Sequence, residues 1–192
     1  MKLTTILFVM SAGIPHANAE VPPPAYQRAS AAQGVPAEIL WAVAKVESNY
    51  RLKIGTYPWP WTLNVNGKAG YYRTRGEACA AAKTAIAQVG GKKVDIGLTQ
   101  QNWGWVGSDF YSDPCDALDP NDNLRTASIR LRQCYEQERD WIMAAGCYHR
   151  PAGGEPARRY REIVQRKLQQ LSPPVRQQAT QRPQPKLASS VP

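Results

Sequence analysis

The chain has 192 residues, enough for one domain with a substantial hydrophobic core, and its formal net charge is +9. A charge of this sign suits nucleic acid as a partner, but the amino-terminal segment reads as an export signal, which argues against nucleic acid. An exported basic protein meets anionic cell-surface polymers instead. The alternative is that the basic residues form an ordinary solvated helix face with no specific partner.

The first 19 residues have the pattern of a signal peptide that is removed on export. Lys2 provides the positive start, residues 3–10 are mostly apolar, and Ala17-Asn18-Ala19 is an A-x-A cleavage site. The alternative is a membrane anchor, but the apolar run is far shorter than the roughly 20 residues that a spanning helix needs. We therefore expect a mature chain that begins at Glu20, lies in the periplasm and contains no membrane span.

Residues 35–49 are expected to form a helix, after a shorter helix over 26–33. Pro36 suits its first position, since the missing N–H would be unpaired there anyway. Apolar residues at helical spacing mark its core-facing side: Ile39, Leu40, Val43 and Val46. Glu47 lies on the same face, where desolvation raises a carboxyl pKa toward a value useful for a general acid. The alternative is an ion-paired or partly exposed glutamate at a frayed helix end.

The next segments predict a hairpin, a helix and a turn. Asn66-Gly67 is a two-residue hairpin signal within the aromatic and β-branched segment 57–74. Thr74 and Glu77 fit a capping box for a helix that continues to Val89 and stops at the following glycines. Residues 94–101 are expected to be a short extended segment or turn that presents Gln100.

Three further helices are expected at residues 121–137, 140–148 and 155–171. From Ser172 onward the composition changes to Pro, Gln, Ser and Arg, with few bulky apolar residues. Such a segment cannot bury enough surface to offset its ordering entropy, so residues 172–192 are expected to be a disordered tail that is dispensable for bond cleavage.

The four cysteines are Cys79, Cys115, Cys134 and Cys147. An even number in an oxidising compartment predicts two disulfides. A zinc site is the competing interpretation, but there is no C-x-x-C pair, and separations of 36, 19 and 13 residues fit no common zinc finger. Three connectivities are open. Cys134 and Cys147 lie at similar distances from the expected helix–helix turn at 137–140, which favours pairing them and leaves Cys79 for Cys115.

Four short motifs follow one another in a characteristic order. They are Glu47-Ser48 at a helix end, Gly97-Leu98-Thr99-Gln100 with Asn102, Asp119-Pro120-Asn121-Asp122-Asn123-Leu124, and Ala144 followed by Tyr148-His149. Together they resemble the soluble lytic transglycosylase family, over about residues 25–164. Residues 58–64 and the Tyr-His pair are similar to the branch of that family associated with conjugation and type IV secretion systems. Thr99 stands where the family usually has Met, and His149 where much of it has Asn.

The resemblance implies a lysozyme-like domain over residues 20–171, mainly helical with one small β-hairpin, that cleaves the MurNAc-β-1,4-GlcNAc bond of peptidoglycan. It implies that Glu47 protonates the glycosidic oxygen and then takes the proton of the sugar's own 6-hydroxyl, which leaves a 1,6-anhydromuramoyl end. Such chemistry needs neither a cofactor nor a metal. The expected partners of this monomer are peptidoglycan strands and proteins of a conjugation or secretion apparatus.

Five further residues are expected to bind the substrate or support the acid: Ser48, Gln100, Asn123, Tyr148 and Tyr160. Ser48 can hydrogen-bond Glu47 or the substrate, Gln100 suits a sugar N-acetyl group, and Tyr148 can hydrogen-bond Glu47 and tune its pKa. Tyr160 matches a second family tyrosine that lines the cleft. Structural alternatives are turn stabilisation for Gln100, ordering of a helix start for Asn123 and core packing for Tyr148. Some of the six tryptophans are expected to stack on sugar rings.

Glycosidases with two carboxylates pair an acid with a second group about 5–9 Å away. Asp95 is the nearest candidate for that second group, although a role in pinning the turn at Gly97 is favoured for it. Without a second carboxylate, the substrate's N-acetyl group would stabilise the oxocarbenium-like centre. Two alternative functions stay open: a hydrolysing lysozyme that uses Glu47 and leaves a reducing end, and a non-catalytic glycan-binding scaffold of a secretion machine.

Overall fold

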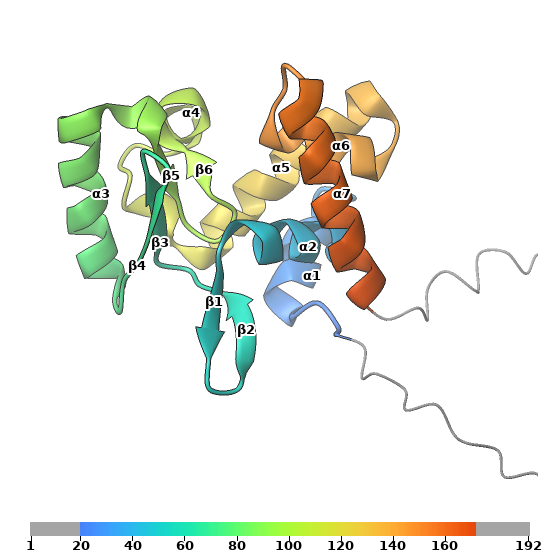
Figure 1. Cartoon of the computed structure of the whole chain (residues 1–192), viewed down its shortest axis with the longest axis horizontal. Helices are drawn as coiled ribbons and strands as arrows, with labels where there is room; N and C mark the ends of the chain where they lie inside the picture. Colours follow the sequence, from blue (N-terminus) through green and yellow to red (C-terminus); the bar gives the residue numbers. More distant parts are fainter. Residues whose placement is uncertain (1–19, 172–192) are drawn as a thin grey trace, which may run out of the picture.

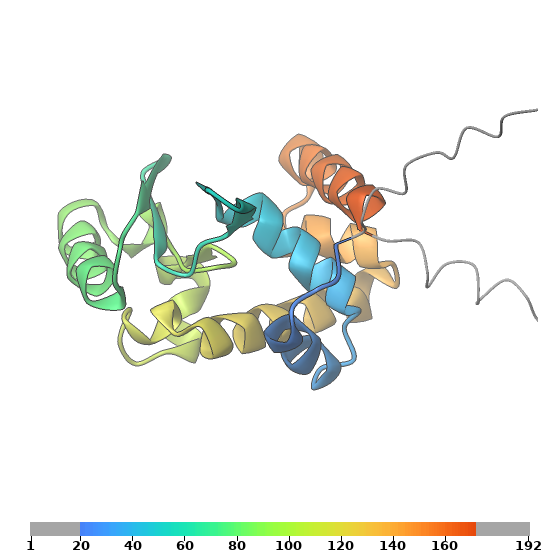
Figure 2. The same ribbon diagram turned by 90° about the horizontal axis from the view of Figure 1, so that it is seen from below.

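The computed structural model describes residues 20–171 (Figure 1). The expected signal peptide, residues 1–19, and the expected tail, residues 172–192, lie outside the described residues. The described chain forms a helical lobe and a β lobe, each with its own hydrophobic core. One long helix, α5 (Pro120–Glu138), runs beneath both lobes (Figure 2).

The helical lobe packs four further helices with α5. They are α1 (Pro24–Ala31), α2 (Ala37–Glu47), α6 (Trp141–His149) and α7 (Gly154–Gln170). Every residue of α2 from Ile39 to Ala44 is buried, so α2 is the central helix of this lobe. Leu131 of α5 and Val164 of α7 belong to the same core. This packing determines where Glu47, the last residue of α2, leaves the core.

The β lobe contains a four-stranded antiparallel sheet against which α3 (Arg75–Val89) packs (Figure 1). Its strands, in order across the sheet, are β4 (Lys68–Tyr71), β3 (Thr62–Val65), β5 (Val94–Ile96) and β6 (Gln101–Asn102). Leu63, Val94 and Ile96 are fully buried in the core of this lobe, beside alanines of α3. Short helical segments complete it: Gly91–Lys93, Trp103–Gly107, α4 (Ser108–Phe110) and Asp116–Leu118.

The hairpin expected at Asn66-Gly67 is confirmed as the β3–β4 connection. Both loop residues have positive φ, 52° and 83°, as a type I′ turn requires. A second hairpin joins β1 (Asn49–Leu52) to β2 (Gly55–Pro58). Sequence reasoning did not predict it, because its loop, Lys53-Ile54, carries no Asn-Gly type of signal. The β portion is therefore larger than the single hairpin expected.

Side-chain caps fix several helix starts. Thr74 Oγ1 accepts a hydrogen bond from the Glu77 amide of α3 at 3.2 Å. The Glu77 carboxylate accepts from the Arg73 amide at 3.0 Å, one residue earlier than the predicted capping box would place it. Asp119 and Asp140 cap α5 and α6 in the same manner. Gly90 ends α3 with φ 82°, as the sequence predicts.

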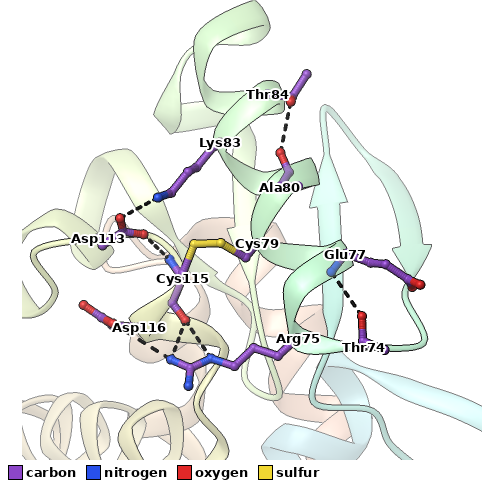
Figure 3. The surroundings of a disulfide bond; sticks show 10 residues. All are labelled: Thr74, Arg75, Glu77, Cys79, Ala80, Lys83, Thr84, Asp113, Cys115 and Asp116. Carbon is purple, nitrogen blue, oxygen red and sulfur yellow. Dashed lines mark hydrogen bonds and ion pairs between the residues drawn. A yellow bond between two sulfur atoms is a disulfide. The ribbon is translucent and has the colours of Figure 1, made fainter.

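Both expected disulfides are confirmed, and each lies in a different lobe. Cys134–Cys147 joins α5 to α6 in the helical lobe. Cys79–Cys115 ties α3 to the loop before α5 (Figure 3). Around it, Lys83 pairs with Asp113 at 2.7 Å, and the Arg75 guanidinium donates to the Cys115 carbonyl at 2.9 Å (Figure 3).

These features confirm the mainly helical, lysozyme-like fold class. Among the helices of residues 20–171, none is long and apolar enough to cross a membrane.

Candidate active site

A cavity of about 740 Å³ lies where the two lobes face each other. The helical lobe contributes Glu47, Arg130, Tyr148 and His149, and the β lobe contributes mainly polar side chains. The β-lobe residues that line the cavity are Asn64, Asp95, Gln100, Asn102, Trp105 and Val106. A second hollow, of about 460 Å³, lies on the α7 side and shares Glu47 and His149 with the first. Glu47 therefore lies where the two hollows meet.

The Glu47 carboxyl group is largely withdrawn from water, with 16% of its side chain exposed. Burial raises its pKa to about 7, since the charged form loses solvation. The negative charge of Asp95 raises this pKa further, whereas a hydrogen bond from Tyr160 and the positive charge of Arg130 lower it. A carboxyl that holds its proton near neutral pH at the edge of a cavity is suited to be a general acid.

The tyrosine that contacts Glu47 is Tyr160 of α7. Its hydroxyl donates to Glu47 Oε1 at 2.6 Å, and only 4% of the residue is exposed. His149 stacks on the Tyr160 ring with 4.3 Å between ring centroids, and its Nδ1 lies 4.0 Å from Glu47 Oε1. Burial lowers the pKa of His149, and the nearby Arg150 lowers it further. The neighbouring helices α6 and α7 thus supply the groups beside Glu47.

Tyr148 does not make the hydrogen bond to Glu47 that the sequence suggested. Its hydroxyl donates instead to the Thr99 carbonyl at 2.8 Å. The Arg130 guanidinium lies 4.8 Å from the centroid of the Tyr148 ring. Tyr148 lines the cavity and also connects α6 to the loop.

The loop that carries Gln100 turns sharply at Gly97, whose φ is 84°. A β-carbon at Gly97 would lie 2.4 Å from the Asn123 side chain, so only glycine fits there. Gln100 itself has φ 46°, and its amide donates to the carbonyls of Gly97 at 2.8 Å and Thr62 at 3.2 Å. Through these bonds Gln100 stabilises the turn, while its side chain also lines the cavity.

Ser48 and Asn123 lie behind this loop, and both are almost fully buried. The Ser48 hydroxyl donates to the Leu98 carbonyl at 2.6 Å. Asn123 Oδ1 accepts from the Thr99 amide at 3.0 Å and from its hydroxyl at 2.7 Å. In these positions the two side chains hold the loop to α2 and α5.

Three polar side chains form a row across the sheet: Asn64 of β3, Asp95 of β5 and Asn102 of β6. Asn64 is directly opposite Asp95, and Asp95 is directly opposite Asn102. The Asn102 amide donates to Asp95 Oδ1 at 2.9 Å. Sequence reasoning singled out Asp95 but missed Asn64 as a cavity residue, although strand alternation next to buried Leu63 could have indicated it.

Among the tryptophans, Trp105 best fits the expected sugar platform. It is 65% exposed and lines the cavity. Lys92 Nζ lies 3.8 Å from its ring centroid. Trp59 and Trp61 pack against each other outside this cavity, and the Trp59 indole donates to the Tyr72 carbonyl.

One group of potential metal ligands occurs within residues 20–171: Cys79, Asp113 and Cys115. Its two sulfur atoms are joined in a disulfide, so neither is available as a thiolate ligand.

Comparison with known proteins gives one informative match. No curated protein and no solved structure matches the chain. The family model described as the transglycosylase SLT domain matches residues 24–172, more than half of the chain and all but four of the described residues. It spans α1 to α7 and includes both sides of the cavity. The chain therefore belongs to the transglycosylase SLT domain family, whose members are glycan-cleaving lytic transglycosylases that act on the cell wall.

Proposed function

We propose that this protein is a peptidoglycan lytic transglycosylase that cleaves the MurNAc-β-1,4-GlcNAc bond and leaves a 1,6-anhydromuramoyl end. The observation that carries the proposal is the state of Glu47. It is a buried carboxyl group with a pKa of about 7, it accepts a hydrogen bond from Tyr160, and it lies at the meeting point of two hollows. Family membership supports peptidoglycan as the substrate.

The reaction uses Glu47 twice. Protonated Glu47 first gives its proton to the glycosidic oxygen as the bond to the anomeric carbon breaks. The Glu47 carboxylate then takes the proton of the sugar's 6-hydroxyl, whose oxygen bonds to the anomeric carbon. The acid is restored at the end of the cycle, and no water is consumed. Tyr160 keeps the carboxyl group oriented in both steps, since its hydroxyl bonds to Oε1.

The surrounding residues divide into two roles. Gln100, Tyr148 and Trp105 line the cavity, and we assign them contacts with the glycan. Ser48 and Asn123 are buried behind the loop, and we assign them the role of holding it in place rather than the substrate contact expected from the sequence. Two hollows that meet at Glu47 are consistent with sugars bound on both sides of the scissile bond.

We further propose that the enzyme acts in the periplasm, where it opens the wall locally for a conjugation or secretion apparatus. The sequence pattern of residues 1–19, which is typical of an export signal, and the two disulfides support the compartment. The motif at residues 58–64 and the Tyr148-His149 pair support the association with such an apparatus.

The product of the reaction tests the proposal. Purified sacculi are digested with the wild-type protein, and the released muropeptides are identified by mass spectrometry. Anhydro ends are expected. Reducing ends would instead identify a hydrolysing lysozyme that uses the same acid. No digestion beyond that of a heat-inactivated control would favour a non-catalytic glycan-binding scaffold.

A further inference from the structure

The cavity contains a second carboxylate, Asp95, which comes from the opposite lobe to Glu47. Strand alternation explains its direction. Val94 and Ile96, on either side of it in β5, are fully buried in the β-lobe core, so the Asp95 side chain projects from the other face of the sheet. That face forms one wall of the cavity that Glu47 also lines.

The partners of Asp95 differ from those expected for a residue that pins a turn. Its carboxylate accepts a hydrogen bond from the Asn102 side chain on the neighbouring strand, at 2.9 Å. The Gly97 turn is stabilised independently, since the Gln100 backbone and side-chain amides both donate to the Gly97 carbonyl. The Gly97 turn therefore does not depend on the Asp95 carboxylate for its hydrogen bonds. A role in the turn does not account for a carboxylate at this wall of the cavity.

Breaking a glycosidic bond leaves positive charge on the anomeric carbon and ring oxygen, and a carboxylate fixed nearby stabilises it. We propose that Asp95 is a second catalytic carboxylate, which lies against the anomeric centre of the bound sugar and stabilises its positive charge while Glu47 transfers the proton. This inference rests on the proposed function. Asp95 neither gains nor loses a proton in the cycle, because the 6-hydroxyl proton goes to Glu47.

The two carboxyl groups are also coupled through their charges. Burial raises the pKa of Asp95, but the hydrogen bond from Asn102 opposes that rise. The Asp95 charge in turn helps to raise the pKa of Glu47. The other ionisable groups that line the cavity or contact Glu47 are Arg130, Tyr148, His149, Arg150 and Tyr160.

Three single variants separate charge from structure. Asp95→Asn removes the charge but can still accept the hydrogen bond from Asn102. Asn102→Ala leaves the Asp95 carboxyl group in place but removes that hydrogen bond, together with the Asn102 hydrogen bonds to the Lys92 carbonyl and from the Trp105 amide. Asp109→Asn removes one negative charge from the exposed start of α4, outside the residues that line the cavity. Thermal unfolding is measured for each variant, so that loss of folding is recognised directly.

The readouts are kcat on soluble glycan fragments and its dependence on pH. We expect Asp95→Asn to lower kcat by roughly 10²–10³-fold, the cost of removing one preorganised electrostatic group. The basic limb of its pH profile should move to lower pH, because a charge that raises the Glu47 pKa is gone. Asn102→Ala should lower kcat much less, and Asp109→Asn should match the wild type.

A folded Asp95→Asn protein with wild-type kcat and an unmoved basic limb would overturn the inference. So would an Asn102→Ala protein impaired as strongly as Asp95→Asn, because Asp95 would then act through its hydrogen bond. Either result leaves the proposed function standing as long as the wild-type protein forms anhydro ends. That function fails separately, if the wild-type protein digests no sacculi.

Discussion

The two lobes line the same cavity in different ways, the helical lobe with a buried carboxyl group and the β lobe with a row of polar side chains. In the helical lobe, Glu47 ends α2, a helix in which Ile39 to Ala44 are all buried, and only 16% of the Glu47 side chain is exposed. In the β lobe, one face of the sheet is the lobe's core and the other carries the row of Asn64, Asp95 and Asn102. Burial raises the pKa of the Glu47 carboxyl group on one side, and strand alternation presents polar groups on the other.

This difference suggests separate functions for the two lobes in the candidate active site. A helix whose central residues are buried can desolvate a carboxyl group at its end, but it offers few groups that hydrogen-bond to a sugar. A half-buried sheet offers a row of such groups at the spacing of its strands. We infer that the helical lobe sets the pKa of the acid and that the β lobe binds the glycan and stabilises its charge.

The largest effect is expected when the contribution of the helical lobe is removed by Glu47→Gln. The amide is isosteric but cannot transfer a proton, and a positioned acid–base group is worth ~10²–10⁴ in rate. Sacculus digestion should fall by that factor with little change in fold. Glu38→Gln, at the other end of the same helix, is the matched control and should keep wild-type activity. Digestion at a near wild-type rate by the Glu47 variant would remove Glu47 from the mechanism.

Stability should respond differently when each lobe loses its disulfide. The Cys79–Cys115 loop spans 36 residues and the Cys134–Cys147 loop 13. On chain entropy alone, replacing both cysteines by alanine should cost about 4 kcal/mol in the β lobe and about 3 kcal/mol in the helical lobe. Urea unfolding of the two double variants measures both costs. A larger cost in the helical lobe would show that chain entropy does not govern the difference.

A smaller effect is expected from the two buried tyrosines, which serve different sides of the cavity. Tyr160→Phe removes a hydrogen bond that lowers the Glu47 pKa, so the Glu47 pKa should rise and the basic limb of activity should move to higher pH. Tyr148→Phe removes a hydrogen bond to Thr99 and should cost about 1 kcal/mol of stability without that movement. A shift of the basic limb in the Tyr148 variant alone would reverse the two assignments.

The smallest effect is expected when the chain is cut directly after Leu171, at the carboxyl end of the helical lobe. Leu171 is 6% exposed and packs in the helical-lobe core. A chain that stops after Leu171 keeps this contact and should match the full chain in melting temperature and in kcat on soluble glycan fragments. A chain that stops after Gln170 loses the buried leucine and should be less stable by roughly 2 kcal/mol. Loss of activity in the chain that stops after Leu171 would show that residues after Leu171 contribute to the active site.

Local sequence signals predicted much of this architecture. Asn66-Gly67, the Thr74 cap and the Gly90 stop each act over a few residues, and each feature is found at the predicted place. The positions of Cys134 and Cys147 about a short turn favoured, without settling, the pairing that the structure has. The apolar face of α2 likewise predicted the burial of Glu47, since one helical period relates the two.

Local sequence signals could not predict which side chains from different helices and strands contact one another. Tyr148 and Tyr160 are both 4% exposed, and only the packing of α6 and α7 decides which hydroxyl reaches Glu47. Ser48 is adjacent to the acid in sequence, yet the end of α2 directs its hydroxyl to Leu98. The β1–β2 hairpin was missed because its loop, Lys53-Ile54, contains none of the residue pairs typical of a two-residue hairpin turn.

The ionisation of Glu47 in the folded protein tests the central claim most directly. Carbon-13 labelling of the glutamate carboxyl groups, with Glu47→Gln to assign the resonance, allows its titration to be followed by NMR. The account predicts a Glu47 pKa of about 7, because the helical lobe desolvates the carboxyl group. A pKa near 4.5, the value of an unperturbed glutamate, would contradict the claim that burial in the helical lobe makes Glu47 the acid.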